Sequence, residues 1–79
     1  MASVTVDETV RRVIADVLDL DPRSIDDQTR MEDMERWDSA NHITLVLALE
    51  EEFGIAFEVP EIEGMITFQD IVATVEAKL

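Results

Sequence analysis

The side chains best suited to chemistry in this sequence lie in the run Trp37-Asp38-Ser39, with His42 shortly after it. Asp38 is a residue type that caps helix N-termini, because its carboxylate accepts hydrogen bonds from the free backbone N–H groups of the first turn. If Asp38 is the cap, Ser39 takes the first helical position and its hydroxyl can point outward. The positive end of the helix dipole favours a negative group there. An exposed Ser39 hydroxyl would therefore suit a phosphodiester linkage.

His42 suggests a second chemistry, because a histidine three positions after Ser39 lies near it on a helix surface. A serine and a histidine can form the nucleophile and base of a hydrolase. The sequence, however, offers neither a third group to orient the imidazole nor a Gly-x-Ser-x-Gly turn. We therefore expect His42 to pack with its ring partly covered, near Trp37 or Ile43. In most proteins a serine at a helix start has no role beyond the first turn.

The element that positions Ser39 is predicted to be a helix from Ser39 to Phe53, ended by Gly54. This interval has no proline or glycine and is rich in Leu, Ala and Glu, which favour helices. Its apolar residues form two stripes on a helical wheel. The first stripe, expected to face the other helices, contains Leu45, Val46, Leu49 and Phe53. The second stripe either completes the core or forms an exposed docking surface, and it contains Ala40, Ile43 and Leu47.

The other helices are predicted by the same kind of apolar periodicity. A first helix is expected over 6–18, with Thr5 as its N-cap in a capping box with Glu8. A final helix should follow the cap Thr67, and the apolar residues repeated along it are Phe68, Ile71, Val72, Val75 and Leu79. Between these helices, an extended linker over 55–59 should lead into a short helix with Pro60 at its first position and Gly64 at its end.

The segment from Asp19 to Trp37 is predicted to be a long loop that spans the bundle between the first two main helices. Ile25, Met31 and Met34 are spaced through it, and we expect them to pin the loop onto the helices. Its aspartates invite a calcium-site interpretation, but Arg23 occupies a ligand position and the central glycine of a calcium loop is absent. No metal site is therefore expected.

The composition predicts one small, acidic domain over residues 1–79. A net charge of −13 disfavours nucleic acid and anionic lipid and favours partner proteins with Lys and Arg at their binding sites, although such charge can also serve solubility alone. The hydrophobic content of 47% argues against a disordered acidic tail, and the lack of cysteine excludes disulfides and thiolate metal sites. With no basic-then-apolar leader and no long apolar stretch, we expect a cytoplasmic protein without stable membrane insertion. We also expect a monomer.

Together these elements predict an all-α fold, a small four-helix bundle of three main helices and one short helix, with a long loop between helices 1 and 2. Asp38-Ser39 at a helix start, the run from Leu47 to Ile55 and the run from Thr67 to Ile71 resemble acyl carrier proteins. The similarity extends from Val6 to about Leu79. It implies an up-down arrangement in which the short third helix crosses the others.

The resemblance implies a non-catalytic carrier. Ser39 would bear 4'-phosphopantetheine, added from coenzyme A by a phosphopantetheinyl transferase, and Asp38 would help that enzyme hold its magnesium ion. Acyl intermediates would travel as thioesters on this arm to ketosynthases, acyltransferases or similar enzymes of fatty-acid, polyketide or specialised lipid biosynthesis. The alternatives are an aminoacyl or peptidyl carrier and an acidic adaptor protein that is never modified.

By position, the resemblance also implies a partner-docking surface made of Ala40, Ile43, Leu47, Glu50, Glu51 and Phe57. The sequence departs from the family pattern at Ala40, where leucine is usual, and at Trp37, where many members have a small residue. The Trp-Asp-Ser run is similar to that of carriers from specialised pathways. Phe57, Ile62 and Met65, which lie opposite the second stripe in the expected bundle, could line an acyl cavity with it; for Ile62 and Met65, packing in the core is the equal alternative.

Overall fold

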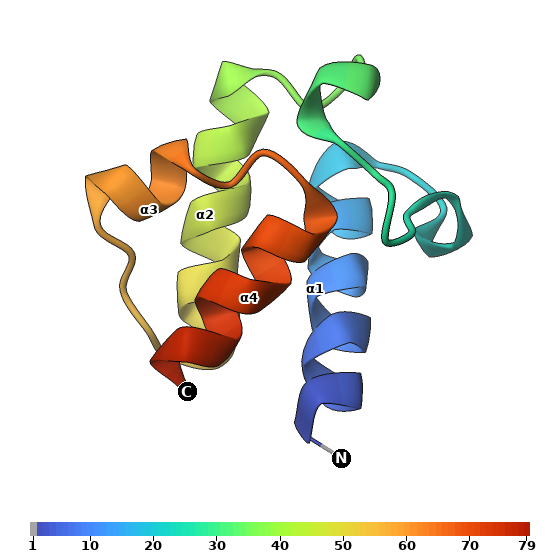
Figure 1. The fold of residues 1–79 in the computed structure, drawn as a ribbon. Helices are drawn as coiled ribbons and strands as arrows, with labels where there is room; N and C mark the ends of the chain where they lie inside the picture. The colour runs from blue at the N-terminus through green and yellow to red at the C-terminus, as the bar shows by residue number, and fades with distance from the viewer. Residues whose placement is uncertain (1) are drawn as a thin grey trace.

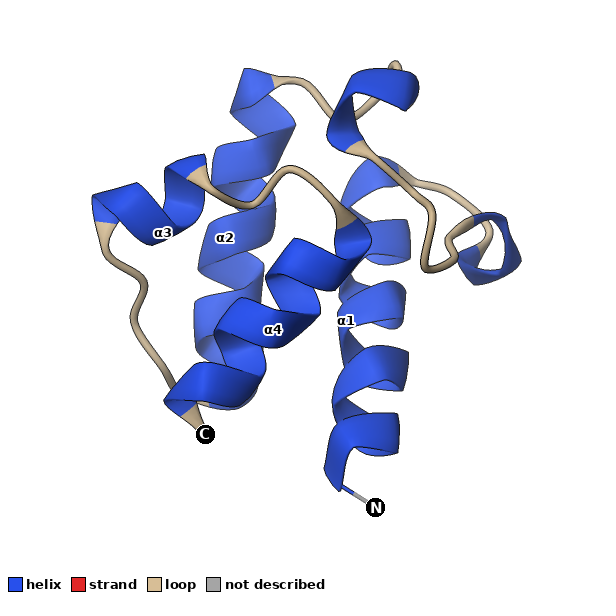
Figure 2. Cartoon of the chain, in the orientation of Figure 1, coloured by secondary structure: helices blue, strands red, loops and turns tan. Residues whose placement is uncertain are grey.

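The computed structural model describes the backbone of residues 2–79 and the side chains of residues 6–79. Over that range the chain forms helices and loops only, which confirms the all-α prediction (Figure 2). The elements in chain order are α1 (Ala2–Leu18), the 3₁₀ turns η1 (Pro22–Ser24) and η2 (Met31–Asp33), α2 (Ser39–Phe53), α3 (Val59–Glu63) and α4 (Phe68–Lys78). In Figure 1, α1 and α2 run in opposite directions, α4 crosses in front of them, and α3 crosses the direction of α2.

The start of α1 differs from the prediction, because the helix begins at Ala2 rather than near Val6. Thr5 therefore lies inside the helix and is not its N-cap, and its side chain is outside the described residues. The apolar repeat marked only the part of the helix that packs on the core. Nothing between Ala2 and Val6 is a helix breaker, so the helix continues outward beyond its buried stripe.

The core is a single cluster to which all four helices or their flanking loops contribute. α1 packs against both α2 and α4. The largest fully buried side chains belong to Val10, Ile14, Leu18, Trp37, Leu45, Leu49, Met65, Phe68, Ile71 and Val75. Leu79, the last residue of the predicted repeat in the final helix, is instead exposed at the end of the chain.

The two apolar stripes of α2 have different environments. Leu45, Val46 and Leu49 are buried, and Phe53 is half-buried against the core. In the second stripe, the exposed fractions of Ile43 and Leu47 are 53% and 59%, and Ala40 is exposed as well. The core interpretation of the second stripe is therefore wrong. Residues two positions apart on a helix are separated by about 200°, so a stripe offset by two from a buried stripe faces away from it.

The long connection between α1 and α2 is pinned to the bundle as predicted. Ile25 is buried, and Met31 and Met34 are half-buried against the core. The backbone also pairs with the segment before α4, because the Met31 N–H donates to the Ile66 carbonyl at 2.8 Å and the Phe68 N–H donates to the Thr29 carbonyl at 3.0 Å. These contacts hold the loop on the bundle and against the segment that precedes α4.

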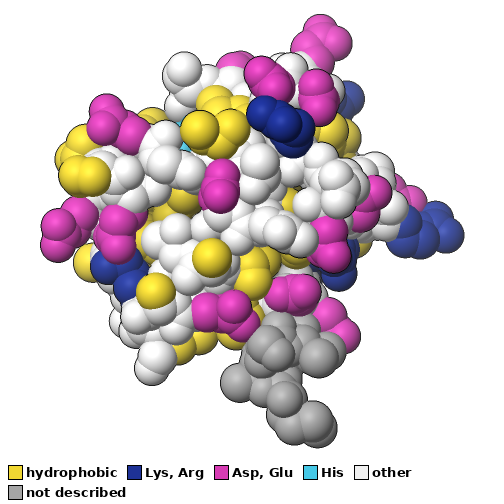
Figure 3. All heavy atoms as spheres, viewed as in Figure 1, with side chains coloured by type: hydrophobic (Ala, Val, Ile, Leu, Met, Phe, Trp, Pro, Cys, Tyr) yellow, Lys and Arg dark blue, Asp and Glu magenta, His cyan; other side chains and the backbone are white. Residues whose placement is uncertain are grey.

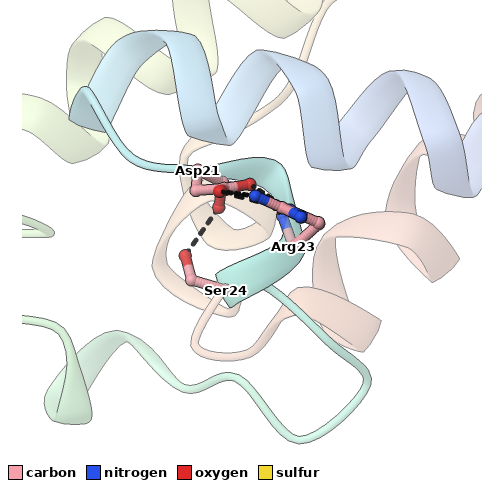
Figure 4. A network of polar contacts seen from close by, with 3 residues as sticks. All are labelled: Asp21, Arg23 and Ser24. Carbon is pink, nitrogen blue, oxygen red and sulfur yellow. Dashed lines mark hydrogen bonds and ion pairs between the residues drawn. The ribbon is translucent and has the colours of Figure 1, made fainter.

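Within this connection, Asp21 engages its close neighbours Arg23 and Ser24 (Figure 4). Its Oδ1 accepts a hydrogen bond from the backbone N–H of Arg23 at 2.9 Å, and its Oδ2 pairs with the Arg23 guanidinium at 2.9 Å. The guanidinium, and then the backbone N–H, hold the pKa of Asp21 below its ordinary value. The Ser24 hydroxyl donates to the Asp21 carbonyl at 2.7 Å. Asp21 therefore caps η1.

The linker predicted over 55–59 is one residue shorter: residues 55–58 lie outside any helix, and Glu58, whose backbone is extended, is the N-cap of α3. Pro60 occupies the second helical position and not the first, because Val59 begins the helix. Glu61 accepts a hydrogen bond from the Glu58 backbone N–H at 2.8 Å and pairs with Lys78 of α4 at 2.9 Å. The first contact, and then the second, lower the pKa of Glu61.

Candidate functional site

Ser39 is the first residue of α2, and Asp38 caps the helix as predicted. Asp38 has an extended backbone, and its Oδ1 accepts a hydrogen bond from the Asn41 backbone N–H at 2.9 Å. Ser39 is exposed, and its hydroxyl forms no hydrogen bond with residues 6–79. Because Asp38 serves as the cap by accepting from the Asn41 N–H, the Ser39 hydroxyl is not needed for capping and is available to a partner in solution.

The turn before Ser39 is anchored by Arg36 and Asn41, two residues whose roles the sequence did not indicate. The Asn41 Nδ2 donates to the Arg36 carbonyl at 2.6 Å. The Arg36 Nη1 donates to the Leu18 carbonyl at 3.3 Å and to the Asp19 carbonyl at 2.8 Å. These carbonyls lie at the end of α1, where helix geometry leaves acceptors unpaired. Arg36 therefore ties the end of α1 to the start of α2.

His42 lies against Trp37, as predicted, and its ring is buried. The Trp37 Nε1–H donates to the His42 Nδ1 at 3.0 Å, and the His42 Nε2 lies 2.9 Å from the Ile62 carbonyl of α3. Both ring nitrogens are thus engaged, and neither contacts Ser39. A general base for the serine must reach its hydroxyl. This arrangement argues against the Ser/His hydrolase alternative.

The residues expected on the docking surface separate into two groups. Ala40, Ile43, Leu47 and Glu51 are exposed, and their spacing places them on the outer face of α2. Glu50 is half-buried on the same face, where its Oε2 accepts a hydrogen bond from the Phe57 backbone N–H at 2.8 Å. Figure 3 shows acidic side chains spread over the face of the molecule seen in that view, with apolar side chains between them.

Phe57 does not belong to this exposed face, which corrects the expectation that it takes part in docking. Its side chain is 9% exposed and lies in the core cluster. The extended linker turns the phenyl ring inward, and the Glu50 carboxylate fixes its backbone from the end of α2. Phe57 and Glu50 together anchor the linker to α2. The hypothesis of a docking surface therefore applies to the residues on the outer face of α2 and not to Phe57.

For Ile62 and Met65 the structure favours core packing over an acyl cavity. Met65 is fully buried in the core cluster, and Ile62 is partly buried against that cluster. A groove of about 620 Å³ lies instead beside Asp38, and its lining residues are Leu20, Asp33, Met34, Glu35, Arg36, Asp38 and Asn41. A smaller groove of about 260 Å³ runs along α4 and is also lined by Asp7 of α1 and Asp27 of the long connection.

The chain is similar to known carriers over most of its length. Residues 8–75 match the family described as phosphopantetheine attachment site. The acyl carrier protein of Thermosynechococcus vestitus is 32% identical over 72 residues, covering 91% of this chain and 89% of the relative. The acyl carrier protein of Campylobacter hominis is 38% identical over 70 residues, covering 87% of each. That of Helicobacter hepaticus is 34% identical over 70 residues, covering 89% of this chain and 92% of the relative.

The chain belongs to the acyl carrier protein family. Members of this family are non-catalytic carriers with a covalently attached 4'-phosphopantetheine. Membership implies interaction with a phosphopantetheinyl transferase and with biosynthetic enzymes. Among the described residues, no helix has the length and apolar character needed to cross a bilayer.

Proposed function

We propose that Ser39 is the attachment residue and that the protein carries acyl groups for biosynthetic enzymes. The observation that supports this proposal is the exposed, unbonded hydroxyl of Ser39 at the start of α2, with Asp38 already serving as the cap. Free first-turn N–H groups and the positive helix end favour the negative charge of a phosphodiester at this place. The residues present therefore fit the group that the family carries.

In the loading reaction, the Ser39 Oγ forms a bond to the phosphorus of the pantetheine phosphate of coenzyme A. The pyrophosphate bond of coenzyme A breaks, adenosine 3',5'-bisphosphate leaves, and the hydroxyl proton passes to a base of the transferase or to water. Asp38 accepts its capping bond through Oδ1, which leaves Oδ2 for the magnesium ion of the transferase. When bound, the arm supplies a terminal thiol that holds an acyl group as a thioester.

The outer face of α2 is the proposed docking surface for partners. It combines the exposed apolar side chains of Ile43 and Leu47 with the carboxylate of Glu51, and Ala40 leaves room beside Ser39. A matching partner has an apolar patch bordered by Lys or Arg. We propose ketosynthases or acyltransferases of fatty-acid, polyketide or specialised lipid biosynthesis as partners, with an aminoacyl or peptidyl pathway as the alternative.

Loading by a broad-specificity transferase tests the attachment residue. After incubation with coenzyme A and magnesium, the intact mass of the protein should rise by one phosphopantetheinyl group. The variant Ser39→Ala should gain nothing, and Ser24→Ala, at an exposed serine in η1, should load like the wild type. A wild-type chain that gains no mass would support the unmodified adaptor instead.

Charge reversal tests the docking surface. Glu51→Lys should slow loading more than Asp27→Lys, because both side chains are exposed but only Glu51 lies on the outer face of α2. The difference should shrink as salt is raised, since exposed charges are screened over about 10 Å at 0.1 M ionic strength. Equal effects of the two reversals would count against a localised docking surface.

A further inference from the structure

A series of buried polar contacts links the segment before Ser39 to α2 and α3, and the carrier function proposed above does not use it. It runs from Trp37 through His42 to the carbonyl of Ile62, with N···N and N···O distances of 3.0 Å and 2.9 Å. Trp37 is 2% exposed and His42 is 9% exposed. Buried polar groups of this kind are costly unless each finds a partner of the right type.

The two partners specify the protonation form of His42. An indole N–H can only donate and a backbone carbonyl can only accept. The Nδ1 atom of His42 must therefore accept from Trp37, and Nε2 must donate to Ile62. This is the neutral ring with its hydrogen on Nε2. A hydrogen on Nδ1 would set two donors against each other, so the two contacts together require the neutral ring with its hydrogen on Nε2.

The contacts of Trp37, His42 and Ile62 join three parts of the molecule that surround the attachment turn. Trp37 lies two residues before Ser39, His42 lies in the first turns of α2, and Ile62 belongs to α3. On its other side the turn is held by Arg36, which bonds to the end of α1. Both residues that precede Asp38 are thus anchored.

We propose that His42 is a positioning residue for the loading of Ser39, an inference that rests on the proposed function. By fixing Trp37 and α3 against α2, it holds the attachment turn in one geometry. A transferase then meets the Ser39 hydroxyl already in place. If the anchor is lost, only a fraction of the molecules present the turn correctly, and the apparent affinity for the transferase falls by that fraction.

Loading kinetics with paired variants test this role. His42→Leu removes both contacts and should raise the KM of the transferase for this protein about tenfold with little change in kcat, a change within the range expected when two hydrogen bonds that order a binding surface are lost. His42→Gln should restore most of the affinity, because its amide can accept from Trp37 and donate to Ile62. Val72→Ala is the matched control: it removes buried volume from α4 without touching the chain of contacts.

Two further measurements do not depend on how well His42→Leu folds. Nitrogen-15 NMR of the wild type at neutral pH should show the hydrogen of His42 on Nε2, and the indole N–H of Trp37, the one tryptophan of the chain, should exchange slowly. Trp37→Phe, which keeps a ring but loses the donor, should raise the KM in the same direction as His42→Leu.

A hydrogen on Nδ1, or a KM for His42→Leu no higher than that of Val72→Ala, would overturn the positioning role while wild-type loading kept the proposed function intact. A wild-type protein that accepts no arm at all would overturn the proposed function, and the positioning role with it.

Discussion

Truncation of two leucines on α2 should separate the core stripe from the docking stripe. Leu49 is fully buried, whereas Leu47 is 59% exposed on the opposite side of the same helix. Leu49→Ala should lower the free energy of unfolding by about 2–5 kcal/mol, the range for a buried leucine that leaves a cavity. Leu47→Ala should change it by less than about 0.5 kcal/mol, as exposed substitutions usually do.

The loss of unfolding free energy expected for Leu49→Ala is large for a chain of 79 residues, whose total stability is expected at roughly 4–12 kcal/mol. It corresponds to a fall in Tm of roughly 8–40 °C at about 4–8 °C per kcal/mol. Urea unfolding followed by circular dichroism measures both variants, and an unchanged slope would show that only stability has changed. A cost for Leu47→Ala equal to that for Leu49→Ala would refute the assignment of the two stripes.

Three other substitutions test local features of the fold. Asp38→Ala should cost about 1 kcal/mol in urea unfolding, and Asp38→Asn should cost much less, because asparagine also caps helix starts. Gly54→Ala should cost about 1–2 kcal/mol by the same assay, because Gly54 has a φ of +66° and the added methyl group meets no atom within 4 Å, so the penalty is conformational. The lowered pKa of Glu61, set by the Glu58 N–H and then by Lys78, stabilises the fold above the unfolded pKa, and this contribution is lost as the pH falls through the folded value. Acidification should therefore lower the stability of Glu61→Gln less than that of the wild type, as measured by urea unfolding across that pH range.

Helix boundaries set by short-range chemistry were predictable from the sequence. Asp38, Gly54 and Thr67 act through their own backbone neighbours, so their residue types carry the information. The predicted start of the first helix was wrong because Thr5, a residue type that often caps helices, lies within a longer helix. A capping residue marks a possible helix start, and the chain before it decides whether the helix begins there.

Features that depend on long-range contacts were harder to predict. Arg36 and His42 both bond to backbone carbonyls far along the chain, and a carbonyl is present at every position, so no residue pattern marks the partner. Phe57 was misplaced for a similar reason. Its position matched the family's docking surface, but the direction of its side chain depends on how the linker packs against α2.

The attachment of the arm to Ser39 is the claim on which the function depends, and fragmentation of the loaded protein in a mass spectrometer tests it most directly. Fragment ions from the segment Trp37 to Asn41 should carry one phosphopantetheinyl group, located on Ser39. A loaded protein whose fragments place the group on Ser24 or on any other residue would contradict the account.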